Sequence, residues 1–193
     1  MEPEKYLWSK AELQSLLTLL KTDEEVVLAS PRLRMFGVVS NGKSSTIFIT
    51  EATVPEDDHN LVQTPVDGRT ENLGAVFLSK QAAHTSQVAI GSELSHMLGV
   101  TKGENLTLLL NTKDGMANAV DVEIANVFNT GNPATDDKFI LTNFSLVQQL
   151  YDTKGAERIV VTLKNPDDLS SVKARLLQKA TKAGFRLEAQ GWD

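Results

Sequence analysis

QVAIGSELSHMLGVTKGENLTLLL, residues Gln87 to Leu110, is the stretch that decides the fold. Val88–Ile90 predicts a short buried strand, and Leu106–Leu110 predicts a second one after a turn at Lys102–Glu104. A brief amphipathic helix is predicted between them. No residue of the stretch has the pattern of a nucleophile or a metal ligand, so the stretch predicts a scaffold rather than a catalytic centre.

The helix in this stretch has a start, an apolar face and an end that single residues indicate. Ser92 is expected to cap its first turn, because a serine hydroxyl can accept a hydrogen bond from an unpaired backbone N–H group there. Gly99 stands where a helix takes a left-handed C-terminal residue. The apolar face recurs at helical spacing and consists of Leu94, Met97 and Leu98.

Length and composition describe an ordinary globular protein. The 193 residues suit one large domain or two small ones, and 41% hydrophobic with 23% charged residues argue against disorder. The formal charge of −6 argues against a nucleic-acid partner. The absence of cysteine excludes disulfides and thiolate metal sites.

Targeting and membrane-spanning segments are not evident in the chain. Its apolar runs, such as Leu106–Leu110, are far too short to cross a bilayer. The opening MEPEKYLWSK is acidic and polar, whereas a secretory signal needs a basic start and an apolar run. The chain therefore begins as a cytosolic protein would, or is a piece excised from something longer.

A helix and a strand are predicted in the first part of the chain. Ser9 and Glu12 form a capping box for a helix over 9–21, which is expected to pack on the protein's own sheet. Its apolar face consists of Leu13, Leu16, Leu17 and Leu20. Val26–Leu28 predicts a short strand, which Pro31 should break or confine to a sheet edge.

Residues 32–49 predict a β-hairpin around Asn41-Gly42, a pair typical of type I′ turns, which need positive φ at both central residues. The same segment matches the phosphate-loop pattern G-x-x-x-x-G-K-[ST] from Gly37 to Ser44. A phosphate loop requires a helix to begin at the Lys-Ser pair, but β-branched residues follow here. The hairpin is the preferred interpretation, and a strand over Thr46–Ile49 would exclude nucleotide binding.

The segment from Glu51 to Ala83 is the least regular part of the sequence. An acidic run, Glu56-Asp57-Asp58, precedes His59, and carboxylates beside a histidine can bind calcium or zinc. This spacing matches no loop of alternating ligands, so we interpret it as a solvated connection. A turn is expected over Pro65–Arg69 and a short strand over Gly74–Leu78.

Two other kinds of candidate site carry little weight. His84 and His96 have no partner carboxylate pattern, and we interpret both as surface or packing residues. Asn105 and Asn143 fit the glycosylation pattern, but both lie beside predicted strand or helix.

After the opening stretch, strands alternate with turns. Strands are predicted over Leu106–Asn111 and Ala119–Phe128, connected through Asp114-Gly115. The polar loop Asn129–Asp137 then leads to a strand over Lys138–Leu141. A helix follows over Ser145–Tyr151 and is expected to end at Lys154-Gly155.

The last segment is typical of a β-α-β unit. Arg158–Leu163 predicts a buried strand, and Asn165 should cap a helix that begins at Pro166 and ends at Gly184. The apolar face of that helix consists of Leu169, Val172, Leu176, Ala180 and Ala183. Phe185–Ala189 is expected to return as a strand. The two chain ends are therefore predicted to form one α+β sandwich with the middle inserted between them.

Taken in order, these segments resemble the extracytoplasmic core domain of the MacB/FtsX/LolE class of ABC-transporter permeases. The resemblance is carried by three stretches, VAIGSELSHMLGVTKGENLTLLL, VDVEIANVFNTGNPATDDKFILTNFSLVQQLYD and ERIVVTLKNPDDLSSVKARLLQKATKAGFRLEAQGWD. ASPRLRMFGVVSNGKSS corresponds to a further stretch that this family places after its first helix. Together these stretches cover most of residues 25–193.

The resemblance implies a division of the chain. Residues 1–54 and 155–193 would form a porter-like β-α-β subdomain, and 55–154 an inserted, smaller, β-rich subdomain called sabre-like. The family domain lies between two transmembrane helices, so both ends are expected side by side, facing the membrane. The family also has a strand before its first helix, for which Met1–Trp8 is a poor candidate.

The resemblance further implies a non-enzymatic periplasmic domain of a membrane-tethered permease. A cytoplasmic ABC ATPase would drive its motion, a periplasmic protein or lipoprotein would be its partner, and a second permease subunit would accompany it. The sequence agrees with this reading because it contains no catalytic constellation. We therefore assign no catalytic, cofactor-binding or metal-ligating residue and expect no cofactor.

Other interpretations of the chain stay open at this point. A free-standing α+β ligand-binding or adaptor protein is one alternative, and a nucleotide-binding protein built on Gly37–Ser44 is a less favoured one. For partner contacts, the loop Asn129–Asp137 and the hairpin tip Ser40–Lys43 are expected to project without a role in the core. Plain solvated turns are the simpler interpretation of both.

Overall fold

The computed structural model describes residues 7–54, 57, 63–66, 69–72 and 86–191, and for 63–66 and 69–72 only the backbone. Its elements are α1 (Lys10–Leu20), β1 (Val26–Ser40), β2 (Ser45–Thr53), β3 (Gln63–Val66), β4 (Arg69–Asn72), β5 (Gln87–Gly91), α3 (Ser92–Leu98), β6 (Asn105–Asn111), β7 (Ala117–Phe128), α4 (Pro133–Asp136), β8 (Phe139–Asn143), α5 (Phe144–Tyr151), β9 (Arg158–Leu163) and α6 (Leu169–Lys182). The predicted α+β class is confirmed.

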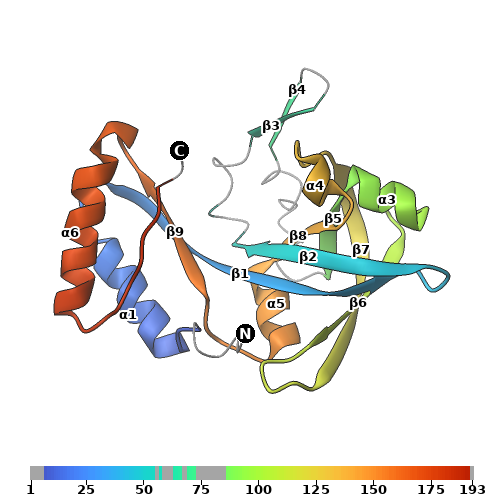
Figure 1. Cartoon of the computed structure of the whole chain (residues 1–193), viewed down its shortest axis with the longest axis horizontal. Helices are drawn as coiled ribbons and strands as arrows, with labels where there is room; N and C mark the ends of the chain where they lie inside the picture. The colour runs from blue at the N-terminus through green and yellow to red at the C-terminus, as the bar shows by residue number, and fades with distance from the viewer. Residues whose placement is uncertain (1–6, 55–56, 58–62, 67–68, 73–85, 192–193) are drawn as a thin grey trace.

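Six strands form a closed ring. β2, β8, β5, β7, β6 and β1 are neighbours in that order, and a direct pairing of β1 with β2 closes the ring (Figure 1). Most neighbours are antiparallel, but β2–β8 and β5–β7 are parallel. The inward-facing side chains of this ring, with apolar side chains of α3 and α5, make the larger hydrophobic core.

Strand β1 serves both parts of the molecule. Its second half, from Leu33 to Ser40, pairs with β2 inside the ring, whereas its first half, from Val26 to Arg32, pairs with β9. α1 and α6 lie side by side over this β1–β9 pair (Figure 1). Their buried side chains, with Ala29 of β1, form a second, smaller core of Leu16, Leu20, Ala29, Val172, Leu176 and Ala180.

Helix α1 confirms the sequence prediction closely. The Ser9 Oγ accepts a hydrogen bond from the Glu12 N–H, and the Ser9 N–H donates to the Glu12 carboxylate, which is the predicted capping box. The predicted apolar face is directed inward, with Leu13, Leu16 and Leu20 buried. Burial of this one face explains why a helix with few charged residues is stable here.

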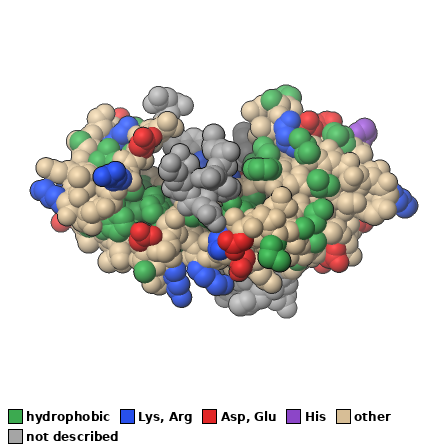
Figure 2. Space-filling view, turned by 60° about the horizontal axis from the view of Figure 1, so that its bottom comes forward, with side chains coloured by type: hydrophobic (Ala, Val, Ile, Leu, Met, Phe, Trp, Pro, Cys, Tyr) green, Lys and Arg blue, Asp and Glu red, His purple; other side chains and the backbone are tan. Residues whose placement is uncertain are grey.

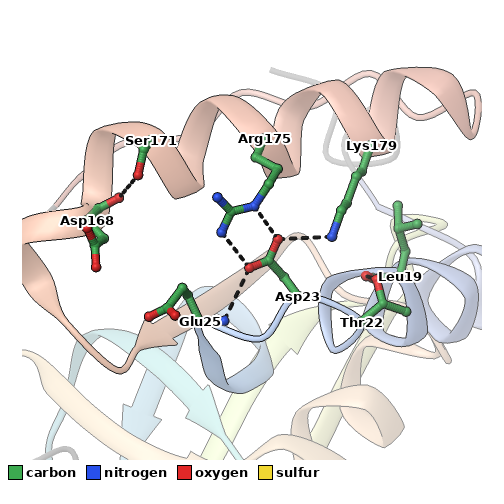
Figure 3. Close-up of polar contacts among 8 residues, drawn as sticks. All are labelled: Leu19, Thr22, Asp23, Glu25, Asp168, Ser171, Arg175 and Lys179. Carbon is green, nitrogen blue, oxygen red and sulfur yellow. Dashed lines mark hydrogen bonds and ion pairs between the residues drawn. The ribbon is translucent and has the colours of Figure 1, made fainter.

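A buried carboxylate ties α6 to the connection between α1 and β1 (Figure 3). Both oxygens of Asp23 are 2.7 Å from nitrogens of the Arg175 guanidinium. Lys179 Nζ is 3.0 Å from the same carboxylate, and the Glu25 N–H donates to it as well. Hydrogen bonds from Arg175 hold the pKa of Asp23 far below its usual range, outweighing the effect of burial, with Lys179 acting in the same direction.

Pro31 does not break β1, because it lies at a position where the strand, within the described residues, has a neighbour on one side only. β1 runs continuously for 15 residues, and at Pro31 its strand partner is Ile159 of β9. Pairing with β2 begins only at Leu33. The missing N–H group of Pro31 is therefore tolerated because the strand has a neighbour on one side there, as edge positions allow.

The predicted hairpin between β1 and β2 is confirmed, but its predicted turn type is wrong. Ser40 pairs with Ser45, so four residues form the connection. Positive φ occurs at Gly42 and not at Asn41. Asn41 instead accepts hydrogen bonds from the N–H groups of Lys43 and Ser44 with its Oδ1. These two side-chain hydrogen bonds hold the turn, and the positive φ at both central residues that a type I′ turn requires is not needed.

The opening stretch folds as predicted except at two positions. Helix α3 follows β5 directly and ends with Gly99 in the left-handed conformation. Met97 is exposed, however, whereas Leu94 and Leu98 are buried. Ser92 accepts no hydrogen bond from the first turn, because a carboxylate from a distant loop occupies that position, as described below.

The end of the chain departs from the predicted β-α-β unit. Asn165 caps the start of the last helical segment as predicted, through its Oδ1 and the Asp167 N–H. Gly184 has the expected positive φ, but Phe185–Ala189 is not a strand. The apolar side chains of Phe185 and Leu187 pack on the smaller core, and their backbone has no strand partner among the described residues. Alternating apolar residues here reflect packing rather than sheet pairing.

Two smaller predictions are also wrong. Helix α5 ends at Asp152, which takes the left-handed conformation itself, so Lys154-Gly155 is not its stop. Gly155 is needed for another reason, because a Cβ atom there would overlap the backbone oxygen of Trp8. Strand β9 is half-buried along its whole length rather than buried.

Several predictions fall on residues outside the described part. These are Glu56 and Asp58 of the acidic run, His59, His84, the strand over 74–78 and the tip of the turn over 65–69. Strands β3 and β4 flank that tip and pair with each other. The domain boundaries, 1–54 with 155–193 against 55–154, stay a prediction.

Candidate functional site

The phosphate-loop alternative is wrong. Strand β2 begins at Ser45, immediately after the Lys43-Ser44 pair, where a phosphate loop would need the first turn of a helix. Gly37 lies within β1, and a Cβ atom on it would overlap the backbone oxygen of Leu109 and crowd the Phe48 ring. Close strand packing, rather than phosphate binding, therefore requires this glycine.

The other polar candidates from the sequence do not form a chemical site. His96 is exposed, and no group of three potential metal-ligating side chains occurs in the part of the chain that is described. Asn143 is buried and caps α5, with its Oδ1 accepting from the Ser145 N–H. Asn143 therefore has a structural role.

The loop Asn129–Asp137 does have a role in the core, so the prediction that it merely projects is wrong. Asp136 is buried. Its carboxylate accepts hydrogen bonds from the Thr130 N–H, the Glu93 N–H and the Ser92 hydroxyl at 2.7–2.8 Å. Burial alone would raise the pKa of Asp136, but these hydrogen bonds outweigh it and lower the pKa.

The other predicted contact segment, the hairpin tip Ser40–Lys43, is held in place from behind. The Asn41 Nδ2 donates to the backbone oxygen of Leu98, at the end of α3, over 2.6 Å. Gly42 and Lys43 remain exposed. The tip is thus a fixed projection of the ring that presents one lysine.

The feature that the sequence did not indicate is an apolar surface on the outside of the ring. Strand register aligns Ile47 of β2, Val38 of β1 and Leu109 of β6 in one row. The next row contains Ile49 and Phe36. Phe36 is 80% exposed, Ile47 63%, Leu109 44% and Val38 39%. We call these five residues, Phe36, Val38, Ile47, Ile49 and Leu109, the outer stripe.

Sequence reasoning missed the outer stripe for a specific reason. On β1 and β2 the outward residues alternate with buried ones such as Val39 and Phe48, so both faces of the strands are apolar. Such a run is typical of a strand buried on both sides. Only the pairing of β1 with β2 and β6 shows that one of the two faces is uncovered.

Charged residues border the outer stripe at one end. Glu51 accepts hydrogen bonds from Arg158 at 2.8 Å with both of its oxygens, and Arg34 Nε is 3.2 Å from the same carboxylate. Glu157 belongs to this group, because its carboxylate accepts from the Arg34 N–H. Burial raises the pKa of Glu157, although Arg158 and Arg34 act in the opposite direction.

A groove of about 1890 Å³ runs past these residues. It is lined by β1 from Arg32 to Val38, by β2 residues from Ile49 onward, by the end of β6 and by β9 residues 160–163. Its volume exceeds the roughly 300–1,000 Å³ of small-molecule pockets. In the space-filling view, hydrophobic side chains gather on both halves of the face shown, with charged side chains between them (Figure 2).

The fold is similar to that of two solved domains. One is the extracellular domain of the noncanonic ABC-type transporter YknZ from Gram-positive bacteria, with a TM-score of 0.62 and 15% identity; the match covers 94% of this chain and 87% of that one. The other is the periplasmic region of MacB from Actinobacillus actinomycetemcomitans, with a TM-score of 0.58 and 11% identity, covering 88% of this chain and 73% of that one.

No protein-family model matches the chain, and no curated protein matches it. At these identities the two structural matches establish the fold. The resemblance inferred from the sequence, to extracytoplasmic domains of ABC-type permeases, is therefore confirmed at the level of the fold.

Proposed function

We propose that the chain is the extracytoplasmic domain of an ABC-transporter permease. The observation that carries this proposal is the match to the YknZ extracellular domain, which spans nearly all of both chains. A match of that extent covers both cores rather than one common motif. The MacB periplasmic region supports the same assignment.

In this proposal the domain does mechanical rather than chemical work. A cytoplasmic ATPase subunit or domain hydrolyses ATP, and the permease transmits the resulting motion to the domain, which acts on a periplasmic protein, a lipoprotein or an exported substrate. Such a role needs a stiff body with a partner surface. The closed ring, the Asp23–Arg175 pair and the buried Asp136 are the kind of contacts that make a body stiff.

The proposed attachment to the membrane lies outside the described residues. None of the described helices is both long enough and apolar enough to span a bilayer. In the proposal, 1–54 with 155–193 form the part nearest the membrane and 55–154 the distal insert. The contact of α1 with α6, the helices nearest the two ends of the chain, supports bringing the two ends together.

The proposal is tested by labelling single cysteines in intact cells. The chain contains no cysteine, so Lys43→Cys at the exposed hairpin tip, placed in the native full-length protein with any other cysteine removed, reports on one position. A membrane-impermeant maleimide should label it without lysis. Met97→Cys, exposed on α3, is a second reporter in case a partner covers the tip.

Labelling of both positions only after lysis would overturn the proposal. The native reading frame gives an independent check, because a permease needs apolar segments of about 20 residues on both sides of this domain. A reading frame without them would instead favour a free-standing ligand-binding or adaptor protein.

A further inference from the structure

We propose that the outer stripe docks a short segment of a protein partner, with apolar side chains over Phe36 and Ile47 and an acidic side chain against Arg34. The inference deepens the proposed function by naming the partner surface. It rests on the geometry of the ring itself, and its test measures the surface and not transport, so the two proposals can fail separately.

The outer stripe is a continuous apolar surface that the rest of the protein leaves exposed. Phe36, Val38, Ile47 and Leu109 are neighbours by strand register and are all substantially exposed. Their exposed parts amount to roughly 400 Å², the size of the largest patch on a typical monomer, which often has a function. Phe36 is the most exposed residue of the patch, and aromatic side chains of this size contribute strongly to the energy of interfaces.

The same area limits what the partner can be. A stable interface between two folded domains takes about 800 Å² from each partner. The outer stripe supplies about half of that, so a second copy pressed against it would gain too little apolar contact. A segment that lies along the stripe and continues into the adjoining groove fits both the small area and the groove volume of about 1890 Å³.

The charge at the end of the stripe selects an acidic residue in that segment. Arg34 lies next to Phe36 on the outward side of β1 and is well exposed. Within the described part of the chain, Nε is the only nitrogen of its guanidinium group with a hydrogen-bond partner, so the two terminal nitrogens are available to a carboxylate. Of the Arg34 nitrogens, Glu51 accepts only from Nε, and it also accepts from Arg158 with both of its oxygens.

The chain offers a matched control on the same strand. Val27 of β1 is 61% exposed, and it lies outside the ring, where β1 pairs with β9. Phe36→Ser and Val27→Ser each remove one exposed apolar side chain from β1. Neither is a core residue, so both variants should fold, which circular dichroism and thermal unfolding can verify.

Random peptides displayed on phage and selected against the immobilised 193-residue chain provide the test. Wild type should enrich segments with two or more apolar residues and an acidic residue at constant spacing. A synthetic peptide of the enriched sequence should bind Phe36→Ser about tenfold more weakly or worse, and Val27→Ser as tightly as wild type. Selection against Arg34→Glu should replace the acidic residue by a basic one.

Three results would overturn the proposal. Unchanged binding to Phe36→Ser would show that the stripe is not the docking surface. The same acidic motif selected by Arg34→Glu would remove the charged contact. A dimer seen by sedimentation in wild type and lost in Phe36→Ser would assign the stripe to a second copy of the chain.

Discussion

Asp136 and Ser92 lie 44 positions apart in the sequence, yet the Ser92 hydroxyl donates to the Asp136 carboxylate over 2.7 Å. The same carboxylate oxygen accepts from the Glu93 N–H at 2.8 Å. The first turn of α3 is therefore capped by a residue from the loop after β7, and not by its own serine. This contact fixes α3 and the loop relative to each other.

Replacing Asp136 should destabilise the protein more than an exposed aspartate would. In Asp136→Asn the amide group faces at least one N–H group that it cannot accept from, which leaves a buried donor unsatisfied at a cost of about 1–3 kcal/mol. Chemical denaturation at neutral pH measures the loss. Asp114→Asn, at an exposed ion pair, is the control and should change stability by less than about 1 kcal/mol.

A double-mutant cycle tests which residue caps α3. Ser92→Ala should lose stability in wild type but little in the Asp136→Asn background, because the hydroxyl's partner is then already compromised. Unfolding free energies of the two single variants and the double variant give the coupling. Strictly additive effects would mean that Ser92 acts alone, as the sequence had suggested.

The ion pair in Figure 3 should make stability depend on pH in the acid range. Because the pKa of Asp23 is lowered in the folded state, its contribution is present above its unfolded pKa of about 3.9 and is lost as pH falls further. Asp23→Asn should therefore be less stable than wild type at pH 7 by about 1–3 kcal/mol, since Arg175 and Lys179 are partly exposed and lose less than buried charges would.

The difference between Asp23→Asn and wild type should shrink as the pH is lowered below about 4, because the unfolded wild-type chain then binds a proton that the folded carboxylate does not bind. Denaturation curves at a series of pH values check this. A difference that is constant with pH would mean that the hydrogen-bond geometry, and not the charge, stabilises the contact.

Local signals in the sequence predicted the fold where residues within a few positions of one another decide the structure. The capping box of Ser9 and Glu12, the Gly99 helix end and the Asn165 cap were correct because each depends on neighbours within a few positions. The prediction failed where a distant segment intervenes. Asp136 took the place of Ser92, and the C-terminal segment found apolar packing without a strand partner.

The candidate site could not be predicted for the same physical reason. An outward apolar residue such as Phe36 has the same sequence pattern as an inward one such as Met35. Which of them is exposed depends on what covers each face of the sheet, and that is decided by strand order and not by local sequence. The pairing of this hairpin with β6 and β8 is therefore the information that the sequence lacked.

Gly37 should be required for strand packing and not for any ligand. Gly37→Ala places a methyl group against the backbone oxygen of Leu109 and the Phe48 ring, and it should cost about 2 kcal/mol or more, since overpacking a rigid site forces the backbone to move. Lys43→Ala, in the same former phosphate-loop match, should leave stability unchanged because Lys43 is exposed. A gain in thermal stability on adding magnesium and ATP to wild type, lost in Lys43→Ala, would contradict this.

Glu157 should behave in the opposite way to Asp23. Burial raises the pKa of Glu157 in the folded state, so its ionised form lowers stability. This cost is absent below the unfolded pKa of about 4.3, grows as pH rises from there to the folded pKa, and is complete above it. Glu157→Gln keeps an oxygen that can accept from the Arg34 N–H but carries no charge. Glu157→Gln should therefore match wild type in acid and be more stable than wild type at neutral pH. Glu188→Gln, at an exposed position, is the control and should match wild type at both pH values.

If Glu157→Gln were instead less stable than wild type at neutral pH, the attraction of Arg34 and Arg158 for the carboxylate would outweigh its burial. The contacts at the charged end of the outer stripe would then require both Glu51 and Glu157 to be ionised.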